Sequence, residues 1–471
     1  MHSRFYLSLL LISGLLVISY LGLTAYHAVM PEWKYYQAEY KDLVVKNAKD
    51  DATRKRAMAM TLGFKQVYLK DLKREDRCIN CHAGVDNPLM EGAKVPFKKH
   101  SGNYLVNHPV DKFGCTVCHD GQSFATNEKE AHGKGHETHW DYPILPLKYV
   151  QSSCAQCHDF NMLAKNGGEK VAKGEELFRE KGCKGCHKID GVGGDIGKAL
   201  DGVGNQPIAY FPMKHVIGER TVFNWLKQHF VDPRALVAES AMKVKLAAGE
   251  DDLLTTYALS LKSEEMPKKY RRINYANPPK YDGEALYKMY CSACHEDGDK
   301  TIYDEVFKRT VPAIKNPSLL RTMNDANMDV IVKEGRAGTQ MTAWKSSAAG
   351  LSDEQIKEII GYLALKRPAE QHEPFGLAAF TGDVKHGKEV YEVNCSVCHG
   401  KDAKGGENLL GISLRSPVVQ KKIDTELLAV TIADGRAGTS MPPFIKDSEV
   451  LTKQDVADVV AFIKEFPSAA K

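Results

Sequence analysis

The sequence predicts a mainly α-helical protein with one N-terminal transmembrane helix, a loop-rich module and three small all-α domains in tandem. Three observations lead to this prediction. An uncharged apolar segment stands near the N-terminus, a five-residue cysteine motif occurs three times within 81 residues, and the rest of the chain contains an internal repeat. With 471 residues, 43% of them hydrophobic, the chain is long enough for several domains rather than one core.

The first element is the apolar segment of residues 5–31, whose 27 residues include no Lys, Arg, Asp or Glu. As a helix rising about 1.5 Å per residue, it would exceed a hydrocarbon core of about 30 Å. A cleaved signal peptide is the alternative, but its apolar region usually has ~7–15 residues and ends at an A-x-A-like site, which is absent here. We therefore expect residues 1–31 to be a retained transmembrane anchor in contact with membrane lipid.

Arg4 precedes this span, so the positive-inside rule favours a cytoplasmic N-terminus. We expect a single-pass protein of the cytoplasmic membrane with its bulk in the periplasm. Residues 32–75 come next; they are charged, contain one glycine and place apolar residues at mixed helical spacing. This pattern predicts a helical stalk.

Two cysteines separated by two residues, with a histidine directly after the second, occur six times and use all 12 cysteines. Zinc needs only paired Cys-x-x-Cys and a redox dithiol needs one such pair, so neither explains the histidine. Haem c does, because the cysteines form thioethers with its vinyl groups and place the adjacent imidazole on iron. We therefore predict six covalently bound haem c groups. The attachment cysteines and proximal ligands are Cys78, Cys81 and His82; Cys115, Cys118 and His119; Cys154, Cys157 and His158; Cys183, Cys186 and His187; Cys291, Cys294 and His295; and Cys395, Cys398 and His399.

Haem attachment also indicates the compartment, because the known maturation systems form these thioethers outside the cytoplasmic membrane. The formal charge of +4 is nearly balanced, and each haem adds two propionates that make the holoprotein more acidic. The charge balance therefore argues against a nucleic-acid partner.

The segment of residues 76–165 holds three motifs, with about 27 residues for each, which is too little protein to build a core of its own. We expect the haems to form the core of a trihaem module wrapped in loops and short helices. Such packing brings the porphyrins close together.

The internal repeat begins after this module. Each of three units opens on Gly-x-x-(Leu/Val)-aromatic, at Gly174, Gly283 and Gly387, and each closes on a helical pattern that contains an aromatic residue. Segments rich in Pro and charge separate the units. The expected domains are residues 166–265, 281–366 and 383–471.

Residues 170–466 resemble tandem class I cytochrome c domains, through the aromatic-bearing first helix, the motif, a downstream methionine and the final aromatic-bearing helix. The front segment with its anchor resembles the cytochrome c subunits of bacterial cytochrome bc-type quinol-oxidising complexes, mainly through HPVDKFGCTVCHDGQ at residues 108–122. This second resemblance implies cytochrome b and Rieske-type, or other quinol-oxidising, subunits as partners.

The second axial ligands are expected to differ between the two parts of the chain. GRAGTQM and GRAGTSM occur at matching places, so Met341 and Met441 are predicted ligands, and Met242 is predicted for the fourth motif, with Met213 as its rival. The arginines of these two sequences either neutralise haem propionates or are solvated. The trihaem module at residues 76–165 offers histidines instead. We predict bis-histidine ligation there from His100, His108 and His139, with His132 and His136 as weaker candidates.

Together these features predict a membrane-anchored hexahaem cytochrome that carries electrons from a quinol-oxidising partner to a soluble periplasmic acceptor. No acid–base pair or nucleophile is evident, so an electron-transfer subunit is favoured over a catalyst on its own. One alternative is a single-anchor multihaem quinol dehydrogenase. Another is a haem enzyme of the nitrite reductase or peroxidase type, which would need an open position on iron.

Overall fold

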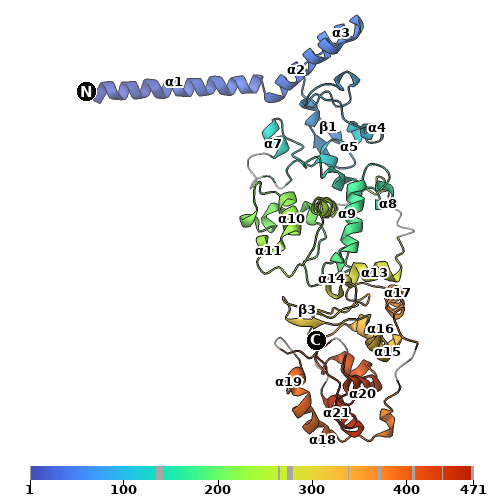
Figure 1. Ribbon diagram of the computed structural model, residues 1–471. Coiled ribbons are helices and arrows are strands. Elements are labelled where there is room, and N and C mark those ends of the chain that lie inside the picture. The colour runs from blue at the N-terminus through green and yellow to red at the C-terminus, as the bar shows by residue number, and fades with distance from the viewer. Residues whose placement is uncertain are drawn as a thin grey trace. The chain divides into compact units, whose positions relative to one another are not determined.

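The computed structural model is mainly helical, as the sequence predicts (Figure 1). It describes residues 2–133, 140, 142–263, 266–272, 279–337, 339–369, 373–405, 409–436 and 439–467. Within these residues the strands form two antiparallel hairpins of three-residue strands. The chain divides into two compact units, each made of three segments.

The first unit comprises Met1–Ala172, Gly204–Ala238 and Thr255–Ile273. Its helices and strands are α1 (His2–Val29), α2 (Glu32–Asn47), α3 (Asp51–Met58), β1 (Val67–Leu69), β2 (Arg74–Asp76), α4 (Tyr104–Asn107), α5 (Val110–Phe113), α6 (Thr116–His119), α7 (Glu128–His132), α8 (Phe160–Leu163), α10 (Val222–Val231) and α11 (Pro233–Leu236).

The second unit comprises Lys173–Val203, Glu239–Leu254 and Asn274–Lys471. Its elements are α13 (Gly283–Tyr290), α14 (Ser292–His295), β3 (Ile302–Asp304), β4 (Arg309–Val311), α15 (Pro317–Thr322), α16 (Asp325–Glu334), α17 (Asp353–Ala364), α18 (Val384–Asn394), α19 (Ser396–His399), α20 (Thr425–Asp434) and α21 (Lys453–Glu465). Two further helices, α9 (Glu169–Glu180) and α12 (Glu250–Ser260), contain points at which the chain passes from one unit to the other.

Figure 1 shows α1 as one continuous helix. It is long and apolar enough to cross a membrane, and its apolar side chains are exposed along its length. An exposed apolar surface of this kind is unfavourable in water and favourable in lipid. The predicted anchor therefore corresponds to one uninterrupted helix.

The segment predicted to be a helical stalk is helical in α2 and α3 but forms the β1–β2 hairpin at its end. Helix α2 buries one face, because Tyr40 and Val44 pack with Ala57 of α3 and with Met90 and Phe97 of the following loops. Residues 32–75 are therefore integrated into the first unit rather than extended as a separate stalk.

Two of the three repeated glycines mark close helix crossings. A Cβ atom on Gly283 would lie 2.1 Å from the carbonyl oxygen of Glu358, and one on Gly387 would lie 2.0 Å from that of Asp458. Only glycine lets α13 and α18 approach α17 and α21 this closely. The aromatic residues of the repeat lie beside these crossings, since the rings of Tyr287 and Tyr362 are 5.5 Å apart.

Tyr391 and Phe462 form the corresponding pair between α18 and α21, with ring centroids 5.4 Å apart. The opening and closing patterns of the repeat therefore meet in the same way in two places. We call residues 281–366 the fifth-motif segment and residues 383–471 the sixth-motif segment.

These two segments share one hydrophobic core. A single cluster of buried side chains runs from Leu286 of α13 to Ile463 of α21. An ion-pair network reinforces the packing, because Glu334 at the end of α16 binds both Lys345 and Lys422, the latter from the sixth-motif segment. The two segments therefore form one body within the second unit.

Candidate haem sites

All six cysteine motifs adopt the same tight turn. In each, the backbone N–H of the histidine donates to the carbonyl of the first cysteine, at distances of 2.9 to 3.1 Å. All 12 cysteines are free of disulfide bonds. The turn therefore presents two thiols and one imidazole together, which is the arrangement that covalent haem attachment requires.

The motif histidines of the second unit are oriented by backbone carbonyls. The Nδ1 atom of His187 lies 2.7 Å from the oxygen of Lys198, and that of His399 lies 2.9 Å from the oxygen of Ile412. His295 makes the same contact with Pro312, at 3.2 Å. A carbonyl accepts only from a protonated Nδ1, so Nε2 is left unprotonated and available to a metal ion.

Burial also favours the neutral imidazole at these positions. It is the main cause that lowers the pKa of all six motif histidines. Neutral imidazole is the form that ligates metal ions. The motif histidines are therefore suited to bind iron at neutral pH.

The three N-terminal motifs open onto one cavity of about 2510 Å³ in the first unit. A site for one drug-sized ligand occupies about 300–1,000 Å³, so this space suits several large groups rather than one. The cysteines and histidines of all three motifs line it, together with His100, His108 and His132. The cavity and its donor set fit three haem groups.

Three histidine pairs face each other around this cavity. The ring centroids of His82 and His132 lie 6.2 Å apart, and those of His119 and His100 also lie 6.2 Å apart. The third pair is His158 and His108, at 6.0 Å. Each pair thus joins one motif histidine to one histidine outside the motifs.

Two of the predicted distal histidines, His100 and His108, are therefore brought beside motif histidines. His132, a weaker candidate in the sequence, takes the third place. His139 and His136 lie outside the described residues.

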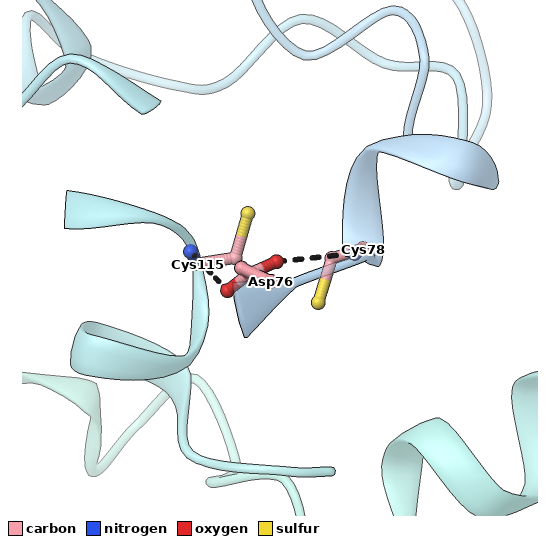
Figure 2. Close-up of side chains that lie close together, drawn as sticks. All are labelled: Asp76, Cys78 and Cys115. Atoms are coloured by element: carbon pink, nitrogen blue, oxygen red, sulfur yellow. Dashed lines mark hydrogen bonds between the residues drawn. The ribbon is translucent and has the colours of Figure 1, made fainter. Parts of the chain in front are cut away.

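A buried carboxylate ties the first two motifs together, as Figure 2 shows. Asp76, at the end of β2, is 0% exposed, and its Oδ1 accepts the backbone N–H of Cys78 at 3.1 Å. Its Oδ2 accepts the backbone N–H groups of Cys115 at 2.8 Å and Thr116 at 3.0 Å, and the Thr116 hydroxyl at 3.2 Å. Asp76 therefore fixes the first two motif turns relative to each other.

Asp76, Cys78 and Cys115 place a carboxylate oxygen and two sulfur atoms within 4.8 Å of one another, which is close enough for a shared metal ion. The carboxylate already accepts four hydrogen bonds, however, and both cysteines belong to haem-attachment motifs. We interpret the cluster as a structural clamp rather than as a metal site.

The sulfur atoms of successive motifs also meet in the second unit. The thiols of Cys186 and Cys294, from the fourth and fifth motifs, lie close enough to interact. Because each thiol marks one edge of a porphyrin, the haems attached at these positions would have neighbouring edges. The first and second motifs stand in the same relation through Cys78 and Cys115.

The two loops that carry the predicted methionine ligands have the same backbone structure. The N–H of Arg336 donates to the carbonyl of Met341, and that of Arg436 to the carbonyl of Met441, both at 2.9 Å. The hydroxyls of the following threonines donate back to the two arginine carbonyls, at 2.8 and 2.9 Å. Met341 and Met441 therefore occupy equivalent positions, as the sequence predicts.

The fourth motif has a less regular environment. The backbone N–H of Met242 donates to the Ser240 hydroxyl at 3.3 Å. His187 and Met242 both belong to the second unit, whereas the rival ligand, Met213, belongs to the first. The assignment of Met242 to the fourth haem stays a prediction.

Arg336 and Arg436 are both half-buried and lie close enough to repel each other. Burial lowers the pKa of Arg336; burial, together with the charge of Arg336, lowers that of Arg436 to about 9. Within the described residues, no carboxylate is paired with either guanidinium. Of the two roles that the sequence left open, neutralising haem propionates fits these half-buried like charges better than solvation does.

Comparison with known proteins gives family matches in the parts of the chain that contain the fourth, fifth and sixth motifs. Residues 279–363 and 382–463 match the family described as cytochrome c oxidase, cbb3-type, subunit III, and residues 171–243 match the family described as cytochrome c. The Cbb3-type cytochrome c oxidase subunit CcoP of Azospirillum sp. (strain B510) is 27% identical over 187 residues, which cover 37% of this chain and 59% of that relative. This chain thus spans less than two thirds of the relative's length.

Among solved structures, a chain of the reducing HAO-like protein complex of Kuenenia stuttgartiensis is 17% identical, with a TM-score of 0.28. That match covers 40% of this chain and 97% of the other. The TM-score is too low for this likeness to bear on the fold. The matched cytochrome c families and the attachment motifs instead carry the conclusion: this chain is a c-type cytochrome, an electron-transfer protein with covalently bound haem c and an N-terminal membrane-anchoring helix.

Proposed function

We propose that this chain is a membrane-anchored hexahaem cytochrome that relays electrons from a quinol-oxidising membrane partner to a soluble periplasmic acceptor. The observation that carries the proposal is the closeness of sulfur atoms from successive motifs, at Cys78 and Cys115 and at Cys186 and Cys294. Motifs joined in this way place porphyrin edges side by side. Electrons can then pass along the chain in short steps.

The axial ligands give the relay a direction. Residues 76–165 hold three bis-histidine haems, and Met242, Met341 and Met441 complete the coordination of the fourth, fifth and sixth. Methionine stabilises ferric iron less than imidazole does, so His/Met haems have higher potentials. Electrons therefore run from the membrane-proximal haems to the three haems held by residues 166–265, 281–366 and 383–471.

The anchor places the trihaem module near the membrane. With its N-terminus in the cytoplasm, the chain exposes its bulk to the periplasm, and cytochrome b and Rieske-type subunits are the proposed electron donors. In a complex of this kind the partner subunits oxidise the quinol, and the six proposed haems of this chain carry the electrons away.

A second candidate rests on the family match. Residues 279–463 are similar to an oxidase subunit, which favours a terminal oxidase in the membrane as the electron acceptor instead of a soluble protein. The donor side of the relay is the same in both readings, so the acceptor alone distinguishes them.

The test begins with the intact mass of the purified chain, which should show six covalent haems. Mild detergent extraction, followed by mass spectrometry of co-purifying subunits, then identifies the neighbours. Quinol-oxidising subunits support the first reading and oxidase subunits support the second. Fewer than six haems contradicts both.

Activity assays on the isolated chain examine the remaining alternatives. We expect no quinol oxidation, nitrite reduction or peroxide reduction without partner subunits. Quinol oxidation by the chain alone would make it a single-anchor quinol dehydrogenase, and turnover of nitrite or peroxide would make it a haem enzyme.

A further inference from the structure

The geometry points to a specific pairing of axial ligands in the front module, which rests on the proposed function. We propose that the first haem iron is bound by His82 and His132, the second by His119 and His100, and the third by His158 and His108. The sequence offers five distal histidines for three irons and leaves their pairing open.

The distances match two imidazoles on opposite sides of one metal ion. A metal–imidazole bond is about 2.0–2.1 Å and the ring centroid lies about 1.1 Å from the nitrogen, so trans ligands have centroids about 6.3 Å apart. The three observed separations are 6.2, 6.2 and 6.0 Å. Ordinary aromatic pairs span about 4.5–7 Å, so one such distance would carry little weight. Three near-equal distances, each including a motif histidine, are what coordination requires.

The hydrogen bonds of the distal rings agree with this role. The Nδ1 atom of His100 lies 2.8 Å from the carbonyl oxygen of Ser101, and that of His108 lies 3.1 Å from the oxygen of Tyr104. A donating Nδ1 leaves Nε2 as the ligand atom, as in the motif histidines of the second unit. The backbone therefore holds both distal imidazoles in the tautomer that binds iron.

The three distal histidines also surround the same cavity. The three distal histidines come from different elements: His132 ends α7, His108 follows α4, and His100 lies in the loop before α4. All three line the cavity that the motif histidines line. Each therefore has one motif histidine as its ring partner, and the pairing leaves no iron of the module without a second ligand.

Substitution by methionine tests the pairs. We expect His132→Met, His100→Met and His108→Met each to remove one of three bis-imidazole low-spin EPR signals and to raise the potential of one haem. His215→Met, an exposed position outside the cavity, is the control and should leave all three signals. If His139→Met removes a signal and His132→Met does not, the first pair is wrong.

The ring angles predict which signal each variant removes. The planes of His158 and His108 are 86° apart and those of His82 and His132 are 49° apart. Near-perpendicular imidazoles leave two iron d orbitals almost equal in energy, which makes the ferric EPR signal more anisotropic. His108→Met should therefore remove the most anisotropic signal and His132→Met the least anisotropic. The reverse order would overturn the assignment.

Glycine variants separate ligation from a structural role. His100→Gly should turn one low-spin haem into a high-spin haem, and added imidazole should restore the low-spin signal. A residue that only supports the fold would not respond to imidazole. The intact mass of each variant reports the haem count independently: six haems with unchanged EPR contradict the pairing alone, whereas fewer than six in the wild type contradict the proposed function.

Discussion

The Oδ2 atom of Asp76 accepts a hydrogen bond from the backbone N–H of Cys115, at 2.8 Å. The same carboxylate holds the N–H of Cys78, so a single buried charge organises two haem-attachment turns that lie far apart in the sequence. A carboxylate is well suited to this task because its two oxygens can accept several hydrogen bonds at once, here from three backbone N–H groups and the Thr116 hydroxyl.

Asp76→Asn should destabilise the front module. The amide replaces one acceptor oxygen with a donor, so at least one backbone N–H loses its charged partner, at a cost of about 1.5–3 kcal/mol. Chemical denaturation, followed by circular dichroism of the haem bands, measures the loss. Asp71→Asn is the matched control, since Asp71 lies on the same hairpin but is exposed and contacts Tyr270 and Lys269. Equal losses in both variants would contradict the clamp.

Gly387→Ala should destabilise the sixth-motif segment. The new Cβ would lie 2.0 Å from the carbonyl oxygen of Asp458, so α18 and α21 must move apart, which typically costs about 1–3 kcal/mol. Gly361→Ala is the opposite case, because nothing lies within 4 Å of the added atom on the exposed face of α17. Gly361→Ala should raise the free energy of unfolding by roughly 0.5–1 kcal/mol. Thermal unfolding can compare the two.

Met441→His should lower the potential of one high-potential haem, within the range of about 0.8 V that axial ligands span. Because the Met341 loop has the same hydrogen bonds, Met341→His should lower the potential of a second haem by a similar amount. Potentiometry monitored by EPR resolves the groups. A shift in one of the low-potential haems, or a single group of potentials in the wild type, would contradict the ligand assignment.

The contact between His386 and Asp458 should make the stability of the α18–α21 packing depend on pH. The Nδ1 of His386 lies 2.8 Å from Asp458, and this hydrogen bond raises the histidine pKa. The stabilisation that this hydrogen bond gives the folded state is therefore complete below the pKa of about 6.5 that His386 has in the unfolded chain. It is lost as the pH rises through the higher pKa of His386 in the folded chain.

The pKa of Asp458 is shifted in the opposite direction to that of His386, so its contribution to stability depends on pH with the opposite sign. Burial raises its pKa, but hydrogen bonds from Asp383, His386 and Gln454 outweigh burial and lower it overall. Its contribution is present above about pH 3.9 and is lost as the pH falls through the folded pKa. His386→Gln should therefore reduce the melting temperature most in mildly acidic buffer, and the difference should shrink above neutral pH. A difference that grows with pH would contradict the assignment.

The sequence predicted those parts of the molecule that local chemistry determines. An uncharged stretch can form α1 whatever surrounds it, and the recurring glycine and aromatic positions of the repeat correspond to helix crossings at Gly283 and Gly387. The β1–β2 hairpin was not predicted, because strands of three residues have too little alternation to be distinguished from a charged helix. Asp76 was missed for a related reason, since nothing local separates it from a surface acid.

The distal ligands show where prediction from sequence ends. Histidines near the motifs were recognisable as candidates, but the partner of each depends on how α4, α7 and the loops between them fold around the cavity. His132 was therefore ranked below His139, although its ring lies beside that of His82.

The histidine pairs interlock along the chain: the pair at residues 100 and 119 lies within the loop closed by 82 and 132, and the pair at 108 and 158 crosses that loop. Under the proposed pairing, a chain whose periplasmic part emerges in N- to C-terminal order delivers these ligands in a fixed sequence. The second haem can acquire both ligands once residue 119 has emerged, the first must wait for residue 132, and the third for residue 158. Under that pairing the irons of this module would gain their ligands out of numerical order, and a nascent chain halted before residue 132 would carry a first haem that lacks His132 and is open to small molecules.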